Sequence, residues 1–199
     1  MTRSRLFRAC TTIVVLLLLG GVHLRPTTAD PAAAATRSIV ANGSFERGIA
    51  LTGWGAELPV GSTAITGWKA SGGPIDYIAT YWQAANGKRS IDLNQQSRGG
   101  IEQTLHIAKG HVYRVTFRIA GNPDAGPTIK KLRVTVPGTA RTFAFDVTGA
   151  TREKMKWAVR RFDFTAQGDR ALLRFRSLVD GSAGPALDFV TVVELAPAP

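Results

Sequence analysis

Short runs in which apolar and polar residues alternate dominate this chain from Ser38 onward, and Gly, Pro, Asn or Asp separates one run from the next. In the clearest run, residues 112–120, Tyr113, Val115 and Phe117 point one way and the Arg and Thr residues between them point the other. A period of two indicates a strand with one buried and one solvated face. Helical periodicity is nearly absent, so the pattern predicts an antiparallel all-β protein.

Similar runs recur along the chain, at residues 64–68, 75–81, 90–93, 100–105, 129–136, 142–147, 157–164, 171–177 and 186–194. Eight to ten strands at this spacing predict a two-sheet β-sandwich, in the form of a jelly roll. The last run has apolar residues at both its odd-numbered and its even-numbered positions, so both of its faces are expected to be buried. This pattern predicts a strand in the middle of a sheet. Between Trp157 and Phe164 the apolar parity changes, which predicts a bulge near Arg160 and Arg161.

Residues 1–29 have the order of a secretory signal peptide, with arginines first, an apolar run at 13–19 and small residues up to Ala29. We expect a flexible leader at 30–37, one sandwich domain at 38–195 and a short tail at 196–199. Cys10 lies before the apolar run, so the mature chain has no thiol. We expect a secreted, released protein without stable membrane insertion after signal cleavage.

The whole chain carries a formal net charge of +11. Four arginines precede Ala29, so 21 basic and 14 acidic residues remain, and the mature chain keeps a charge of +7. A basic exported protein favours anionic glycans, teichoic acids or membrane surfaces over nucleic acid. The alternative is that the charge serves solubility alone.

Two carboxylates stand at opposite ends of the expected domain, Glu46 in the segment 42–46 and Asp188 in the segment 184–190. A sandwich that brings its ends together places them close to each other, where they repel unless a cation lies between them. Calcium prefers such oxygen ligands, so the pair is a candidate structural calcium site. The alternative is that Glu46 is an exposed turn residue and Asp188 an outward strand residue.

Several motifs follow one another in a specific order over residues 40–193, among them Asn-Gly-Ser-Phe-Glu at 42–46, Ile-Thr-Gly-Trp at 65–68, Trp-Gln-Ala-Ala-Asn-Gly at 82–87, Gly-Ile-Glu-Gln-Thr at 100–104 and Gly-Pro-Ala-Leu-Asp-Phe-Val at 184–190. This series resembles the bacterial choice-of-anchor C family and its relative, the plant cell-wall family called domain of unknown function 642. The resemblance implies a galactose-binding-like β-sandwich in an exported, noncatalytic protein that contacts cell walls.

In similar carbohydrate-binding sandwiches, the Glu of the opening motif and the Asp of the closing motif often ligate a structural calcium. The resemblance therefore implies the same role for Glu46 and Asp188. Bacterial members commonly end in a surface-anchoring segment, and this sequence departs from them by ending at Pro199. We therefore expect a soluble secreted form.

Sugar rings stack on aromatic planes and need polar partners for their hydroxyl groups. Tyr81 and Trp82 lie beside Gln83 and Asn86 in a loop-like stretch, which predicts a sugar-binding platform there. Three further aromatic residues stand in strand-like contexts that favour the core, namely Trp68, Tyr77 and Trp157, and Trp54 is a remaining aromatic candidate.

A second candidate surface is the solvated side of the regular strands, which carries Arg114, Arg118, Lys131, Arg133, Arg174 and Arg176. If these strands share a sheet, the basic side chains cluster and bind carboxylate or phosphate polymers. The alternative is an ordinary solvated face whose charges prevent edge pairing.

Catalytic signatures are weak. His106 and His111 have no paired zinc spacing, and no Gly-x-Ser-x-Gly motif occurs. Asp76 and Asp92 are the pair to consider for glycoside hydrolysis, which needs two spaced carboxylates. We expect a noncatalytic protein that binds a polysaccharide or another cell-wall polymer. The alternative is an extracellular adhesion or matrix protein that binds anionic polymers through a basic sheet face.

Overall fold

The structure is a computed structural model, and it describes residues 37–195. The predicted signal peptide, nearly all of the leader and the tail lie outside these residues. No helix within residues 37–195 is long and apolar enough to cross a membrane. The strands of this part are β1 (Gly55–Leu58), β2 (Lys69–Ala70), β3 (Ile75–Ile78), β4 (Ser90–Asp92), β5 (Gly100–His106), β6 (Val112–Gly121), β7 (Ile129–Val136), β8 (Thr139–Asp146), β9 (Ala158–Thr165), β10 (Arg170–Ser177) and β11 (Pro185–Glu194).

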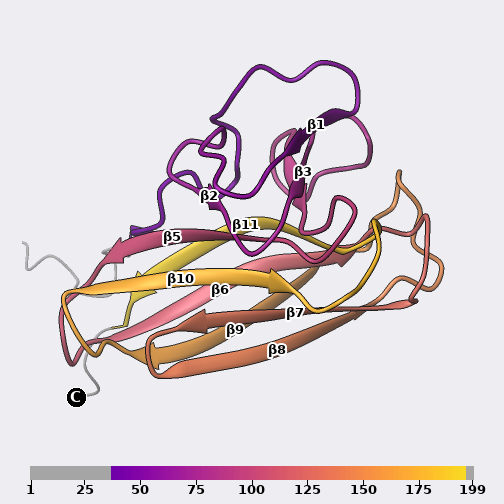
Figure 1. Cartoon of the computed structure of the whole chain (residues 1–199). Helices are drawn as coiled ribbons and strands as arrows, with labels where there is room; N and C mark the ends of the chain where they lie inside the picture. The colour runs from indigo at the N-terminus through magenta and orange to yellow at the C-terminus, as the bar shows by residue number, and fades with distance from the viewer. Residues whose placement is uncertain (1–36, 196–199) are drawn as a thin grey trace, which may run out of the picture. The chain divides into compact units, whose positions relative to one another are not determined.

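The strands form two antiparallel sheets packed face to face (Figure 1). One sheet has the order β1-β3-β4-β11-β6-β9, and the other has the order β2-β5-β10-β7-β8. The predicted two-sheet sandwich is confirmed. β11 lies between β4 and β6, so the prediction that the last strand is central is also correct.

The alternating runs form the long strands because alternate side chains enter the space between the sheets. Tyr113, Val115 and Phe117 of β6 are at most 2% exposed, whereas the residues between them face outward. Burial of each such side chain stabilises the fold by roughly 1.5–3 kcal/mol. Phe117 makes edge-on contacts with Phe143 and Phe175, with ring centroids 5.1 and 5.2 Å apart. These contacts join the two sheets at their centre.

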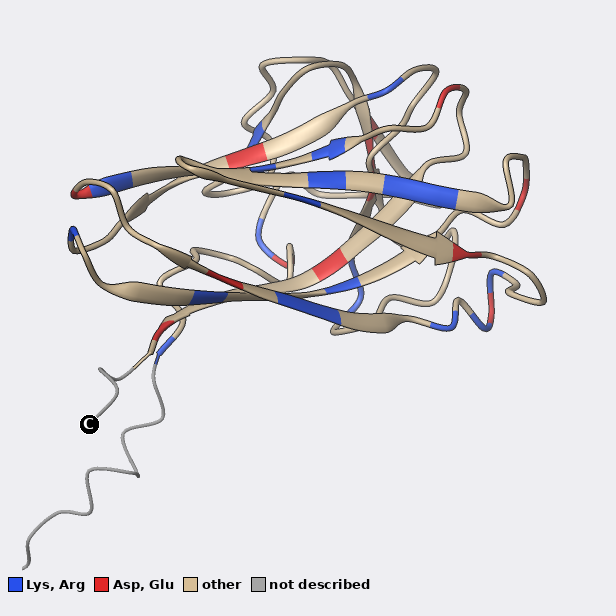
Figure 2. Ribbon diagram, turned by 90° about the horizontal axis from the view of Figure 1, so that it is seen from below, with Lys and Arg blue, Asp and Glu red and all other residues tan. Residues whose placement is uncertain are grey.

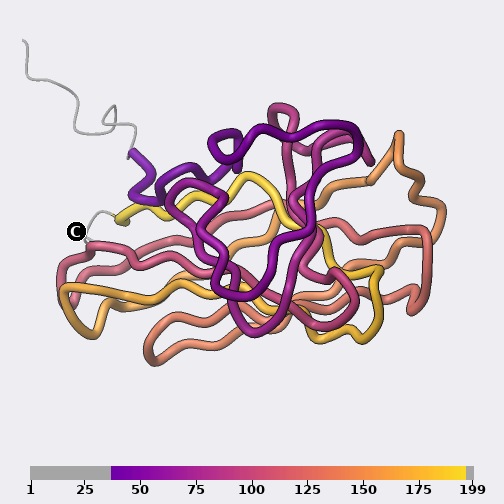
Figure 3. Tube along the Cα trace, turned by 45° about the horizontal axis from the view of Figure 1, so that its top comes forward, coloured from indigo at the N-terminus to yellow at the C-terminus, as the bar shows by residue number. Residues whose placement is uncertain are grey.

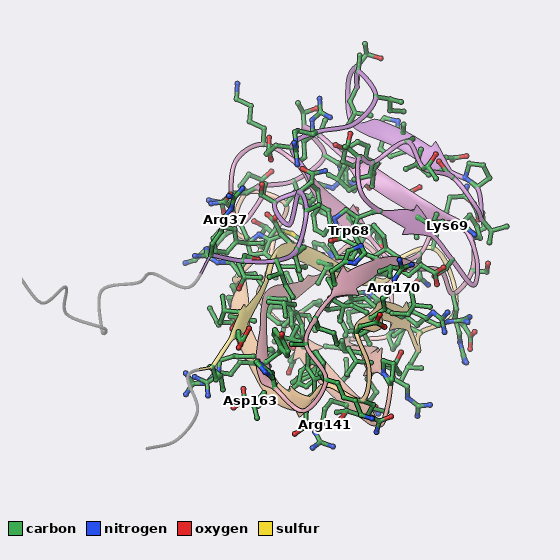
Figure 4. All side chains as sticks on the ribbon, turned by 90° about the vertical axis from the view of Figure 1, so that its left-hand side faces the viewer. Arg37, Trp68, Lys69, Arg141, Asp163 and Arg170 are labelled. Atoms are coloured by element: carbon green, nitrogen blue, oxygen red, sulfur yellow. The ribbon has the colours of Figure 1, made fainter. Side chains whose placement is uncertain are left out.

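The segment before β5 covers one side of the sandwich (Figure 3). Trp68 anchors it, because its ring packs against Phe45 at 5.4 Å and Phe175 at 6.4 Å. Figure 4 shows Trp68 lying inside, while Lys69 and Arg141 lie at the periphery. The prediction that Trp68 belongs to the core is confirmed by its 3% exposure.

Two local predictions differ from the structure, and strand β1 was missed. The β6–β9 pairing runs from Val112 to Ile119 without a register shift, so the predicted bulge in β9 is wrong. The parity changes there because Val159 faces solvent at 58% exposure. A register shift lies instead in β11, between Asp188 and Thr191. Residues 64–68 form only an isolated bridge through Ile65, and β1 was not predicted.

The first described segment runs beside β11. The peptide N–H of Ile39 donates to the carbonyl of Val192 at 2.9 Å, and that of Val190 donates to the carbonyl of Gly43 at 2.8 Å. Both described chain ends therefore lie at one end of the sandwich (Figures 1 and 3). The loops after β6 and β10 lie at the opposite end, because β6 and β11 are antiparallel.

Candidate functional site

A pocket of about 270 Å³ lies at this second end, where the loops after β6 and β10 meet β1, β3 and β4. Its aromatic side chains are Trp54 and Tyr81, which come from the segments flanking β1 and β3. The polar lining consists of the carboxyl groups of Glu57, Asp76, Asp92 and Asp124, the amides of Gln95, Gln96 and Asn122, and the hydroxyl group of Ser182. The pocket thus combines an aromatic wall with polar groups of several elements.

The aromatic wall is fixed in place by a polar network. The Trp54 and Tyr81 ring centroids are 6.2 Å apart in an edge-on arrangement, and Trp54 is 42% exposed. The Tyr81 hydroxyl donates to Asp124 Oδ2 at 2.5 Å, an interaction that raises the pKa of Tyr81. Arg152 lies 4.0 Å from the Tyr81 ring centroid and forms an ion pair with Asp124 at 2.9 Å. These contacts therefore restrain the Tyr81 side chain, which forms one side of the aromatic wall.

Three carboxyl groups line up across the floor of the pocket. In the strand register, Glu57 of β1 is opposite Asp76 of β3, which is opposite Asp92 of β4. Glu57 is exposed at the rim, Asp76 is half-buried and Asp92 is fully buried. Burial, followed by the charge of Glu57, raises the pKa of Asp76 to about 7. Burial also raises the pKa of Asp92 to about 8.

Hydrogen bonds hold Asp92 on both sides. Its Oδ1 accepts from the peptide N–H groups of Asn94 at 3.0 Å and Gly184 at 3.1 Å, and its Oδ2 accepts from Asn122 Nδ2 at 3.0 Å. Asp76 differs, because its Oδ1 is buried and has no hydrogen-bond partner within the described part of the chain. Asp92 is therefore held in place by the protein through both oxygens, whereas Asp76 is not held through its Oδ1.

Lys130 lies behind the pocket and is 0% exposed. Its Nζ donates to the carbonyls of Ala125 at 2.6 Å and Ala183 at 2.7 Å, both of which belong to pocket-lining loops. Burial lowers the pKa of Lys130, and the charges of Asp92 and Asp124 oppose that shift. Lys130 thus joins the two loops from below.

The predicted sugar platform is only partly accessible. Tyr81 is in the pocket, but Trp82 is 4% exposed and its indole Nε1 donates to Ser90 Oγ at 2.8 Å. Trp82 is therefore a core residue that supports Tyr81 from behind, with their ring centroids 5.5 Å apart. Gln83 and Asn86 are exposed in the following loop and do not line the pocket.

The predicted single basic face is wrong, because the strand order divides it. Arg114 and Arg118 lie on β6 of the six-stranded sheet, whereas Arg174 and Arg176 lie on β10 of the five-stranded sheet together with Lys131 and Arg133 of β7. Basic residues accordingly occur in both layers (Figure 2). All six project from the outer faces, on opposite sides of the sandwich.

Several of these basic residues are already engaged. Arg114 pairs with Asp163 at 2.8 Å, and Arg174 pairs with Glu102 at 2.8 Å. Arg118 donates to the carbonyl of Ala85 at 3.0 Å. These contacts leave less free charge than the sequence count implies.

The predicted calcium ligands hold one loop. Glu46 Oε1 accepts from the peptide N–H groups of Lys88 and Arg89, both at 2.9 Å. Asp188 Oδ2 accepts from those of Ala85 and Asn86, both at 2.8 Å. Asp188 is 0% exposed, so it is not an outward strand residue. Burial above all, with a further contribution from the Glu46 charge, raises the pKa of Asp188 to about 7.

Within residues 37–195, neither Glu46 nor Asp188 forms an ion pair, and no cluster of three or more acidic, His or Cys side chains suits a metal. Neither carboxylate is within ion-pair distance of a side-chain cation in this part of the chain, although Arg118 of β6 is directly opposite Asp188 in the strand register. Calcium takes further ligands from peptide carbonyls and water, so the donor set fits in part. The calcium site stays a prediction.

Sequence reasoning considered Trp54, Asp76 and Asp92 but did not assign them to a binding site. It missed Glu57, Asn122, Asp124 and Lys130 altogether. One signal was available, because Asp76 and Asp92 each stand between apolar residues of a short strand, where an exposed Asp is not expected. The loop residues carry no comparable local signal.

The fold is a two-sheet antiparallel β-sandwich, and solved structures of carbohydrate-binding modules are similar to it. The solved structure of TmCBM61 in complex with β-1,4-galactotriose is similar to this chain with a TM-score of 0.53 and 15% identity, over 80% of this chain and all of that chain. The chain belongs to the family described as "Protein of unknown function (DUF642)", whose model matches residues 38–193.

Two further similarities concern larger proteins. The CBM22-1–CBM22-2 tandem domain of Xyn10C from Paenibacillus barcinonensis has a TM-score of 0.51 and 23% identity, over 83% of this chain and 49% of the tandem. Halomucin from Haloquadratum walsbyi is 28% identical in an alignment of 196 residues that covers 92% of this chain. The chain spans only 2% of the length of halomucin.

Proposed function

We propose that this protein is a secreted, noncatalytic carbohydrate-binding protein whose ligand is a polysaccharide of a cell wall or cell surface. The observation that carries the proposal is the pocket in which Trp54 and Tyr81 stand over a floor of carboxyl and amide groups. An exposed indole offers a flat apolar surface to the C–H face of a sugar ring. The floor offers acceptors and donors for the ring hydroxyls.

The hydrogen bonding of Asp92 supports binding rather than hydrolysis. Both of its oxygens already accept hydrogen bonds from Asn94, Gly184 and Asn122. A carboxyl group that acts as nucleophile or as general acid needs an oxygen directed at the substrate. Neither oxygen of Asp92 is directed at a ligand in this way. Asp92 is therefore unsuited to act with Asp76 as a pair of catalytic carboxylates. The similarity to carbohydrate-binding modules agrees with this assignment.

The test is binding of the purified protein to a panel of polysaccharides, measured by affinity electrophoresis and by pull-down on insoluble glycans. Trp54→Ala removes the exposed wall of the pocket, and we expect it to abolish retention. Val159→Ala removes another exposed apolar side chain, on β9 outside the pocket, and serves as the control. Retention of Trp54→Ala equal to that of the unmodified protein would reject the pocket as the glycan site.

A second candidate is adhesion to an anionic polymer through the outer face of the five-stranded sheet. Arg133 of β7 is directly opposite Arg176 of β10, and Lys131 is the next outward residue of β7. Like charges in this position destabilise a sheet unless an anion screens them. Binding that is lost at high salt and in the double variant Arg133→Ser with Arg176→Ser, but kept in Trp54→Ala, would favour this candidate.

A structural calcium between Glu46 and Asp188 is the proposed accessory of the fold. Both carboxylates hold the loop that begins after Trp82, whose ring supports Tyr81. The cation would therefore support the aromatic wall from behind.

Export is proposed from the sequence of residues 1–29, and N-terminal sequencing of the protein from the culture medium tests it. A mature chain that begins at Asp30 is the expected result.

A further inference from the structure

The pocket floor carries more negative charge than the surrounding side chains balance. Its acidic residues are Glu57, Asp76, Asp92 and Asp124. Arg152 pairs with Asp124, and the Lys130 ammonium group lies behind Asp92. Within residues 37–195, Glu57 and Asp76 form no ion pair. Two neighbouring carboxyl groups thus face the cavity without a cation.

The strand register makes this arrangement costly. Glu57 is directly opposite Asp76, and Asp76 is directly opposite Asp92. Like charges in directly opposite positions of a sheet are destabilising. Because burial raises the pKa of Asp92 to about 8, the repulsion at pH 7 is mainly between Glu57 and Asp76. The Oδ1 atom of Asp76 is also buried without a donor, which costs about 1–3 kcal/mol when nothing satisfies it. A ligand that brings a positive charge between Glu57 and Asp76 removes the repulsion between the two carboxylates.

We propose that the pocket binds a sugar with a free, protonated amino group, so that the ligand is an amino sugar whose ammonium group lies between Glu57 and Asp76. This inference rests on the proposed function, because it names the sugar class for the same pocket. An ammonium group offers three N–H donors and one charge, whereas a hydroxyl offers a single donor and no charge. The sugar ring then lies against Trp54, the exposed aromatic residue of the wall.

The alternative occupant of an acidic pocket is a metal ion. Both oxygens of Asp92 accept hydrogen bonds from the protein, and Asp124 is bound by Arg152 and Tyr81. In the part of the chain that the structure describes, no cluster of three or more suitable side chains is arranged for a metal. The aromatic wall has no role in metal binding, but an ammonium group benefits from it.

Proton linkage follows from the same geometry. The charged or titratable groups around Asp76 are Glu57 on β1, Asp92 on β4, Asp124 and Arg152 on the loops and Lys130 on β7. Burial raises the pKa of Asp76 to about 7, so a cationic ligand must displace a proton from this carboxyl group near neutral pH. Binding of the ammonium form should therefore release a proton from Asp76, and the affinity for this form should weaken as the pH falls from about 7 to about 5.

The experiment is calorimetric titration at pH 7 with three oligosaccharide sets of equal length: free-amine glucosamine oligomers, N-acetylglucosamine oligomers and neutral gluco-oligomers. We expect the free-amine set to bind at least tenfold more tightly, with proton release detected by comparing buffers of different ionisation enthalpy. Asp76→Asn and Glu57→Gln should each lower free-amine affinity by tenfold or more, and should lower it more than they lower the affinity for the acetylated set. Glu153→Gln is the control for lost surface charge, because Glu153 is exposed outside the pocket.

The outcomes separate this inference from the proposed function. Equal binding of all three sets, abolished by Trp54→Ala, overturns the amino-sugar assignment and keeps the carbohydrate-binding pocket. Failure of every glycan in the panel overturns both. Free-amine binding that survives Asp76→Asn and Glu57→Gln, or that calcium chloride displaces at constant ionic strength, also overturns the assignment. The basic exterior of the chain repels a polycation, so nonspecific attraction does not imitate the expected result.

Discussion

Glu46 and Asp188, from opposite ends of the folded chain, hold neighbouring parts of one loop. Glu46 accepts hydrogen bonds from the peptide N–H groups of residues 88 and 89, and Asp188 accepts hydrogen bonds from those of residues 85 and 86. Gly87 lies between these two pairs at φ 66°, and a Cβ there would be 2.4 Å from Glu46 Oε1. The first segment, the middle loop and the last strand are thereby joined at one point.

Chelation tests whether a cation takes part in this junction. If calcium binds, addition of EDTA should lower the Tm by roughly 5–10 °C, because a site saturated about 100-fold over its Kd contributes about 2.7 kcal/mol. Calcium should restore the Tm. Differential scanning calorimetry measures it.

Glu46→Gln is the informative variant for the same site, because an amide oxygen still accepts the two peptide N–H groups but does not supply charge. We expect this variant to lose its response to EDTA and calcium while remaining folded. An unchanged Tm of the unmodified protein in EDTA would instead show that the peptide N–H groups hold the two carboxylates without a metal.

The buried carboxyl groups of the pocket predict how stability depends on pH. The pKa values of Asp76 and Asp92 are raised to about 7 and about 8, above the value near 4 of an unfolded chain. The folded state therefore holds these protons more tightly, and the stabilisation is complete below pH 4 and lost as the pH rises through 7 and 8. We expect a Tm about 5 °C or more lower at pH 8.5 than at pH 5.5. Asp92→Asn should flatten this difference, and a Tm that rises over the same range would contradict it.

Lys130 should be required for stability even though it is charged and buried. Lys130→Met removes the hydrogen bonds that Nζ donates to the carbonyls of Ala125 and Ala183. Each carbonyl left without a donor costs about 1–3 kcal/mol. Urea unfolding should show a loss of at least about 2 kcal/mol. Lys131→Met changes the adjacent, outward lysine and should stay within about 0.5 kcal/mol. Equal stability of the two variants would mean that the loops do not depend on Lys130.

Gly43 allows the first segment to approach β11. A Cβ at this position would lie 1.8 Å from the carbonyl oxygen of Val190, whose N–H bonds to Gly43. Gly43→Ala should therefore separate the two segments and cost about 2–3 kcal/mol. Gly168→Ala is the control, because no atom lies within 4 Å of its Cβ position, and it should have little effect. Thermal denaturation of the two variants side by side decides whether the approach is required.

The regular strands were predictable because their alternation reports burial residue by residue. β6 and β7 occupy nearly the predicted ranges, with Leu132 and Val134 inward as expected. The segment before β5 was harder to predict, since its strands are short and its residues are held by side chains such as Gln103, which bonds to Ala41 and Gly67. Such contacts have no period along the sequence.

The candidate site was only partly predictable. Tyr81 and Trp82 are adjacent and both aromatic, yet one lines the pocket and the other is buried beside Ser90. Trp54, which forms the exposed wall, has no neighbour in sequence that marks it. Whether an aromatic residue meets solvent depends on what packs against it from distant segments.

The alternation of apolar and polar residues is enough to predict the all-β class, the positions of the long strands and the buried side of each strand, because a period of two is a local property of the chain. Which strands are neighbours depends on contacts between distant segments and is seen only in the folded protein. Strand order separates Arg118 from Arg174 onto opposite faces, and it lines up Glu57, Asp76 and Asp92 in one pocket. The pocket and its charge arise from pairing between segments that are distant in sequence, which no local pattern records.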